Sequence, residues 1–236
     1  MAWHSHVNLL AVSLVFSSGK SVILLHSLDE CSTCKFTDPP LTHPKQLRVT
    51  CLQWKPLSGR VLAVGCQDCI IIWEMPSLLE KNWKSRKLIG CGKQYPVTSL
   101  EFCPRGRLLA AGSLYDSSIT IWNMATERPA PIKRIGGGIT CLSWSSDGTR
   151  LFSGYKSNTF RIWDTKSWKY VRESCDTFVK RCVWSSNGSL LLYIQKDLNY
   201  LYMYDIDQSL HGILLDLSLL ILGLLIHSKV IVFLFY

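Results

Sequence analysis

Short apolar runs separated by turn-forming residues recur along most of the chain, and they do so with a fixed internal spacing. Each copy has an aromatic residue at the end of one run, and an apolar anchor follows seven or eight residues later. Turn residues such as Asp147-Gly148 and Asn187-Gly188 lie between the two. Because these dipeptides supply the positive φ angles of tight hairpins, the pattern predicts pairs of antiparallel strands.

A second aromatic residue follows the first after 19 or 20 residues in four of the five copies. The first aromatics are Trp3, Trp54, Phe102, Trp144 and Trp184, and the second are Trp73, Trp122, Trp163 and Tyr204. A further strand is expected between copies, for example around Ile132 to Ile135. Four short strands in each unit of about 40–50 residues are typical of a β-propeller, whose blades must stack to bury their faces. We therefore predict an all-β fold of about five blade units.

The phased aromatics resemble those of WD40 repeats. Trp163-Asp164 matches the dipeptide after which those repeats are named, and Trp73-Glu74, Trp122-Asn123 and Tyr204-Asp205 are degenerate versions of it. The Gly-His pair usual in such repeats is absent. We therefore expect the hydrogen-bond network that involves that histidine to be missing.

Three longer runs, residues 49–73, 96–127 and 136–164, are similar to a WD-repeat family of nucleoporins. The WKPLS phrase, the Cys-Gln-x-Cys turn and the Gly-Gly-Gly before a repeat carry the resemblance. It implies a non-catalytic scaffold of the nuclear pore complex at the nuclear envelope, which supports nucleocytoplasmic transport through protein–protein contacts. The implied partners are other nucleoporins, among them a transmembrane nucleoporin of the pore membrane.

The repeats occupy residues 1–207, and residues 208–236 form an apolar tail. Five units are fewer than the seven of the common propeller, so we expect an incomplete propeller. The tail has three interpretations. Residues 213–236 are long enough to span a bilayer, although Asp216 and Lys229 lie among them. Residues 213–226 and 230–236 could instead add strands to the propeller, or the tail is an aberrant, aggregation-prone C-terminus.

The composition and the charge exclude a disordered chain and suggest alternative functions. Hydrophobic residues make up 47% and charged residues 18%, which excludes a disordered chain. The net charge of +9 suits an acidic partner. Basic residues surround Trp83 and Trp168, so a propeller subunit that contacts RNA is the runner-up function, although no RNA-binding motif is present. A membrane-anchored adaptor that uses the tail is the third.

Cysteine and glycine patterns offer little chemistry. The chain has ten cysteines, and no Lys or Arg precedes the apolar stretch 7–16, so reduced thiols are favoured over secretion. The pairs Cys31/Cys34 and Cys66/Cys69 lie further apart than zinc ligands usually do, so packed free thiols are favoured. Gly136–Gly138 is not followed by the Lys-Ser/Thr of a phosphate-binding loop. We predict no metal, no cofactor and no enzymatic activity.

The remaining candidates are loop residues, because binding sites on rigid scaffolds lie preferentially on loops. We expect five of them to line one face of the propeller and to contact a partner. They are Tyr115, Asp116, Arg134, Tyr155 and Lys156.

Overall fold

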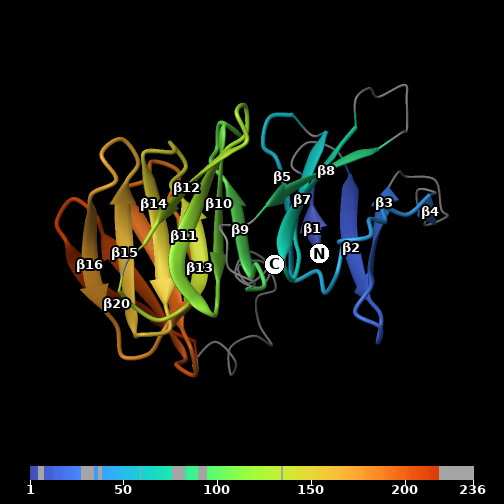
Figure 1. Cartoon of the computed structure of the whole chain (residues 1–236). Coiled ribbons are helices and arrows are strands. Elements are labelled where there is room, and N and C mark those ends of the chain that lie inside the picture. The colour runs from blue at the N-terminus through green and yellow to red at the C-terminus, as the bar shows by residue number, and fades with distance from the viewer. Residues whose placement is uncertain are drawn as a thin grey trace.

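The structure is a computed structural model that describes residues 1–4, 8–27, 35–36, 39–58, 60–75, 83–89, 95–133 and 135–217. Twenty strands form five sheets, and each sheet contains four antiparallel strands in chain order. Figure 1 shows the sheets following one another from β1–β4 at the right to β13–β20 at the left. This confirms the prediction of an all-β fold with about five units, which are called blades 1 to 5 below.

The strands are short, as the turn spacing predicts. Blade 1 holds β1 (Ala2–Trp3), β2 (Leu9–Val15), β3 (Ser21–Ser27) and β4 (Lys35–Phe36). Blade 2 holds β5 (Cys51–Trp54), β6 (Val61–Gly65), β7 (Cys69–Glu74) and β8 (Lys84–Ile89). Blade 3 holds β9 (Ser99–Phe102), β10 (Leu108–Ser113), β11 (Asp116–Asn123) and β12 (Arg128–Ile132). Blade 4 holds β13 (Ile139–Trp144), β14 (Arg150–Tyr155), β15 (Thr159–Asp164) and β16 (Tyr170–Ser174). Blade 5 holds β17 (Val179–Trp184), β18 (Leu190–Gln195), β19 (Tyr200–Asp205) and β20 (Leu210–Asp216).

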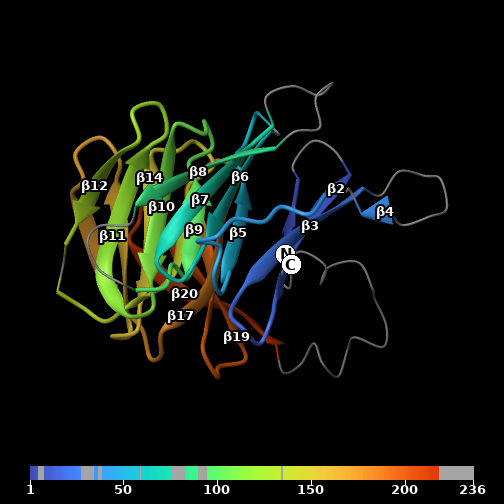
Figure 2. The same cartoon turned by 45° about the vertical axis from the view of Figure 1, so that its right-hand side comes forward.

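The first strands of successive blades contact one another in chain order, β1 with β5, β5 with β9, β9 with β13 and β13 with β17. These are the inner strands of the propeller, and Figure 2 shows blade 2 between blade 1 and blade 3. Two repeated hydrogen bonds tie the inner strands together. The Thr50 and Thr140 hydroxyls donate to Val97 O and Val179 O of the next blade.

The inner-strand tryptophans make the second repeated bond, in the opposite direction along the chain. The indole Nε1 of a tryptophan in one blade donates to a backbone carbonyl of the blade before it. The three bonds are Trp54 to Ala2 O at 3.1 Å, Trp144 to Glu101 O at 3.1 Å and Trp184 to Ser143 O at 3.2 Å. The sequence repeat of the first aromatic therefore has a structural cause, since it joins neighbouring blades.

The aromatic markers also form the core. Each is at most 8% exposed except Trp3, which is 50% exposed. Each second aromatic pairs across the strands with an apolar anchor, for example Trp73 with Leu62 and Trp163 with Leu151. Burying one such side chain contributes about 1.5–3 kcal/mol. The core clusters mix residues of adjacent blades, so the blades stack as the repeat requires.

Two of the second aromatics donate hydrogen bonds to buried side-chain acceptors. Trp163 Nε1 donates to the Ser153 hydroxyl at 2.8 Å, and Trp73 Nε1 donates to Gln46 Oε1 at 3.1 Å. Gln46 is 1% exposed. The hairpin turns follow expectation, because Gly148 and Gly188 have φ angles of 74° and 70°.

Two strand positions differ from the sequence prediction. The strand expected around Ile132 to Ile135 is β12, which ends at Ile132. Pro129 and Pro131 lie within β12, which the sequence reasoning missed because proline usually excludes a strand. They are tolerated because β12 is the edge strand of its sheet. In blade 5, β20 falls inside the stretch that the sequence assigned to the tail.

Several predicted features lie outside the described residues. They are Arg134, Cys31, Cys34 and the tail beyond residue 217. Among the residues that the structure does describe, no helix is long and apolar enough to cross a membrane.

Candidate interaction surface

Three loops of blades 3 and 4 meet at one end of their strands. They are the turn between β10 and β11 at residues 114–115, the loop at residues 135–138, and the turn at residues 156–158. Lys156 N donates to Gly138 O at 2.9 Å. A Cβ on Gly138 would lie 1.9 Å from Leu114 O, so only glycine allows this approach of the backbones. A Cβ on Gly137 would lie 2.9 Å from Ser157 N, so Gly137 and Gly138 are both packing requirements of this surface.

The surface carries exposed apolar groups and a cation. Ile135 is 96% exposed and Tyr115 is 63% exposed. The Nζ atom of Lys156 lies over the Tyr115 ring, 5.4 Å from its centroid. Exposed aromatic and aliphatic side chains beside a cation are typical of protein-interaction surfaces. We call Tyr115, Ile135, Gly136–Gly138, Lys156 and Ser157 the rim surface.

The structure brings together part of the predicted set. Tyr115 and Lys156 contact each other on the rim surface. Asp116 is adjacent, and its Oδ2 accepts a 2.5 Å hydrogen bond from the Ser118 hydroxyl. Tyr155 is fully buried, so it supports the rim surface from below and does not reach a partner. Arg134 belongs to the undescribed residues.

Sequence reasoning missed Arg161 of β15. Its side chain is 3% exposed, and its guanidinium carbon lies 4.3 Å from the centroid of the Tyr155 ring. The repeat could have indicated Arg161, which lies two residues before the second aromatic of blade 4. The same position is Ile71 in blade 2 and Tyr202 in blade 5. An arginine at a position that is otherwise uncharged marks blade 4.

The inner strands enclose a second feature, a cavity of about 600 Å³. Among the described residues, its lining includes Lys180 and Arg181 of β17 and no Asp or Glu. Cys141 and Cys182 face it from neighbouring blades. The hydrogen bond with the Cys182 thiol lowers the pKa of Cys141, whereas burial raises the pKa of Cys182. The cavity is therefore cationic, and it holds paired thiols.

The described thiols are free. Cys66 and Cys69, at the tight turn of blade 2, are 0% and 1% exposed, as expected of packed free cysteines. Among the residues that the structure describes, no three His, Cys, Asp or Glu side chains are grouped so as to hold a metal ion.

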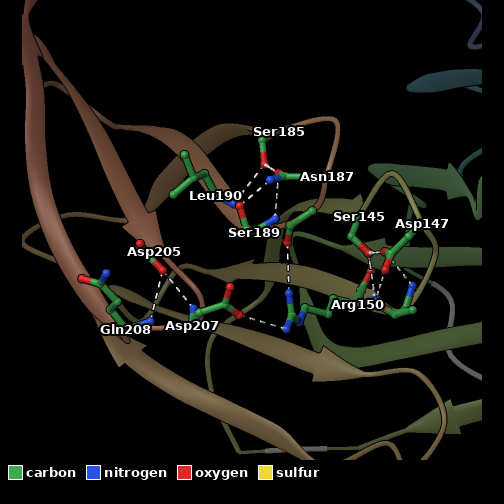
Figure 3. A network of polar contacts seen from close by, with 12 residues as sticks. Ser145, Asp147, Arg150, Ser185, Asn187, Ser189, Leu190, Asp205, Asp207 and Gln208 are labelled. Carbon is green, nitrogen blue, oxygen red and sulfur yellow. Dashed lines mark hydrogen bonds and ion pairs between the residues drawn. The ribbon is translucent and has the colours of Figure 1, made fainter.

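The opposite ends of blades 4 and 5 are joined by a polar network (Figure 3). Arg150 Nη1 donates to Gly188 O at 3.0 Å, and its Nη2 lies 3.8 Å from the Asp207 carboxylate. Within the blade 4 turn, Ser145 and Thr149 donate hydrogen bonds to Asp147. Burial raises the pKa of Asp147, but these hydrogen bonds outweigh it and lower the pKa to about 2. These polar and charged side chains are therefore paired with one another or with backbone atoms.

A comparison with known families matches the repeats. The model described as WD domain, G-beta repeat matches residues 84–123 and 131–164. Residues 84–123 and 131–164 are WD40 repeats. The first match begins at β8 and ends at β11, and the second begins within β12 and ends at β15. Each of these two repeats therefore contains the last strand of one blade and the first three strands of the next. This phasing ties neighbouring blades covalently.

Curated proteins with similar sequences are also repeat proteins. The chain is 27% identical to aladin of Arabidopsis thaliana over 218 residues, which cover 81% of this chain and 47% of aladin. It is 25% identical to the periodic tryptophan protein 2 homolog of Caenorhabditis elegans over 180 residues, 72% of this chain and 17% of that protein. It is 30% identical to human coronin-7 over 124 residues, 50% of this chain and 13% of that protein. The chain thus spans less than half the length of each.

A solved structure has the same fold. A chain in the crystal structure of the mitotic checkpoint complex superposes with a TM-score of 0.74 at 19% identity, covering 91% of this chain and 64% of that one. The WD40 repeats, the propeller architecture and the likeness to aladin together support a scaffold that acts through protein–protein contacts.

Proposed function

We propose that this chain is a non-catalytic WD40 scaffold of the nuclear pore complex, which supports nucleocytoplasmic transport at the nuclear envelope. The observation that carries the proposal is the similarity to aladin, a nucleoporin, over 81% of the chain. The partners are then other nucleoporins, including a transmembrane nucleoporin of the pore membrane.

The rim surface is the proposed contact with these partners. Tyr115 and Ile135 offer apolar area outside the core, and Lys156 adds a positive charge at their border. The polar network at the opposite ends of the strands instead pairs its side chains with one another and with backbone atoms. Tyr115 and Lys156 therefore bind the partner directly, and Asp116 borders the contact.

Proximity labelling in cells tests the proposal. The full chain is compared with a chain that ends at Leu217, which keeps β20, and with a Tyr115→Ser, Lys156→Ser double variant. We expect nuclear-pore proteins among the labelled neighbours of the first two and a several-fold loss for the double variant. Lys166→Ser, in an exposed turn at the opposite ends of the strands, is the matched control and retains labelling.

Absence of nuclear-pore neighbours from both the full and the shortened chain would refute the proposal. Labelling by the shortened chain alone would show that residues 218–236 interfere with assembly. Recovery of RNA-binding complexes in place of pore proteins would support the RNA-contacting alternative.

A further inference from the structure

Arg161 is a buried cation without a complete set of partners. Its Nη2 donates to Ile135 O at 2.7 Å, but Nε and Nη1 are buried and have no hydrogen-bond partner. The Tyr155 and Tyr170 rings lie 4.3 and 5.3 Å from the guanidinium carbon. None of the ion pairs among the described residues includes Arg161. Burying a charge is costly unless an opposite charge and hydrogen bonds compensate for it.

The fold itself does not require arginine at this position. The equivalent residues are Ile71 in blade 2, Thr120 in blade 3 and Tyr202 in blade 5, and Ile71 is fully buried there. Arg161 also pairs directly across the strands with Arg172. Like charges in opposite positions of a sheet destabilise it. Arg161 therefore destabilises the fold in two ways, by its buried charge and by its pairing with Arg172. The equivalent position of blade 2 holds an isoleucine.

The loop above the guanidinium leaves room for a small group. A Cβ built on Gly136 would lie 3.4 Å from Tyr155 Cδ1, 3.6 Å from Arg161 Nη1 and 3.7 Å from Ser157 Oγ. These are ordinary contact distances, so a space of about methyl size lies between the loop and Arg161. A guanidinium N–H and a hydroxyl, both suited to an anion, border this space.

We propose that the space beneath residues 135–138 binds an oxyanion, a carboxylate or a phosphate on a protein partner, which forms an ion pair with Arg161. The unpaired N–H groups at Nε and Nη1 can each donate a charge-assisted hydrogen bond to an oxyanion. Lys156 adds a second cation at the entrance, and Ile135 and Tyr115 flank it with exposed apolar area. The partner segment is thus an acidic or phosphorylated residue beside an apolar side chain.

Binding requires a movement of the loop. The Nε and Nη1 atoms of Arg161 are covered in the free protein, so residues 135–137 must lift for an anion to reach them. Gly138 stays in place, because it packs against Leu114 O. The inference rests on the protein-interaction role of the proposed function and not on its cellular location.

Inorganic phosphate and acetate are the probes for the test, with the full purified chain. Thermal unfolding is followed as each anion is titrated against sodium chloride of equal ionic strength. We expect a saturable rise of the unfolding midpoint beyond that in chloride. A response to phosphate alone assigns a phosphorylated partner, and a response to acetate as well assigns a carboxylate. No response to either anion overturns the proposal.

Arg161→Ile, which installs the residue of blade 2, and Gly136→Ala, which fills the space, are the variants. We expect each to weaken the apparent affinity for the anion at least tenfold. Gly136 has a φ of 159°, so alanine there also strains the backbone; Gly148→Ala, at a φ of 74° and with ordinary contacts only, is the matched control and keeps the response. An undiminished response in Gly136→Ala overturns the proposal even if Arg161→Ile does not fold.

A second readout distinguishes anion binding from a structural role of the arginine. In buffer without phosphate or acetate, Arg161→Ile should unfold at the same temperature as the wild type or higher, because an uncompensated charge is removed. A clearly lower midpoint, together with no anion response in the wild type, shows that Arg161 only supports the fold. These outcomes are independent of proximity labelling, so the proposed cellular function and the anion site can fail separately.

Discussion

At the scale of single residues, the blades differ in how they satisfy the buried indole of the second aromatic. Trp163 donates to the Ser153 hydroxyl of the neighbouring strand, but the buried Nε1 of Trp122 has no hydrogen-bond partner. The residue equivalent to Ser153 in blade 3 is Ala111, which carries no acceptor. A cavity of about 60 Å³ borders both Ala111 and Trp122. Blade 3 thus keeps the tryptophan of the repeat without its acceptor.

We predict that Ala111→Ser stabilises the chain. The new hydroxyl can accept from Trp122 Nε1 as Ser153 does from Trp163, and the adjacent cavity leaves room for it. A net gain of about 1 kcal/mol in the free energy of unfolding is expected, measured by urea denaturation. Ser153→Ala is the reciprocal variant and should lose about 1–3 kcal/mol, because it leaves the Trp163 indole unpaired. An unchanged or lower stability of Ala111→Ser would contradict this explanation.

Glu101 is a second residue whose environment has a measurable consequence. Its carboxylate accepts hydrogen bonds from Trp144 N at 3.2 Å and the Ser143 hydroxyl at 3.4 Å, between the inner strands of blades 3 and 4. Burial raises its pKa from 4.5 to about 8, and these hydrogen bonds only partly oppose the rise. Glu101 is therefore mainly protonated in the folded chain at neutral pH.

We predict that Glu101 makes the chain less stable as the pH rises from about 4.5 to 8. In that window the folded state holds a proton that the unfolded state has lost, so raising the pH favours unfolding, and the effect levels off above pH 8. Glu101→Gln should reduce this decline, because glutamine does not titrate. Between pH 5 and pH 8 the folding equilibrium constant of the wild type should fall more than tenfold relative to that of the variant. Denaturant unfolding at several pH values measures it, with the exposed Glu127→Gln as control. Parallel pH profiles for wild type and Glu101→Gln would exclude the mechanism.

At the scale of elements, a glycine three residues after the apolar anchor allows blades 2, 3 and 4 to pack against the next blade. It is Gly65 in blade 2, Gly112 in blade 3 and Gly154 in blade 4. A Cβ on Gly112 would lie 2.8 Å from Ile139 of the next blade, and one on Gly65 would lie 3.0 Å from Val97 O. In blade 5 the position is Ile194, which lines the central cavity.

We predict that Gly112→Ala destabilises the chain by about 1–3 kcal/mol, because Ile139 is fully buried and must shift to make room. The loss should appear in the denaturation midpoint. Gly212→Ala, on β20, meets no neighbouring atom and should change stability by less than about 0.5 kcal/mol. Equal effects of the two substitutions would show that strand propensity, and not blade packing, selects the glycine.

At the scale of the whole molecule, the phased aromatics predicted the five sheets, because buried aromatics recur at the same two positions of blades 2 to 5. The hairpin turns were predictable as well, since Gly148 and Gly188 adopt the positive φ that the pattern requires. The bounds of β12 were not predictable, because Pro129 and Pro131 argue against a strand in the sequence and are tolerated only at a sheet edge. The rim surface was predicted only in part. The burial of Tyr155 and the missing hydrogen-bond partners of Arg161 depend on packing between blades, which no local sequence pattern encodes.

The hydrogen bonds between inner strands give the stack a mechanical character. Among the described residues, each pair of successive blades is joined by a threonine or a tryptophan bond and by shared apolar clusters. A pulling force on the two ends would load these interfaces in series, so the weakest would yield first and the others would still hold. The molecule should then lengthen in steps of one blade, and it would resist tension as a row of separate links.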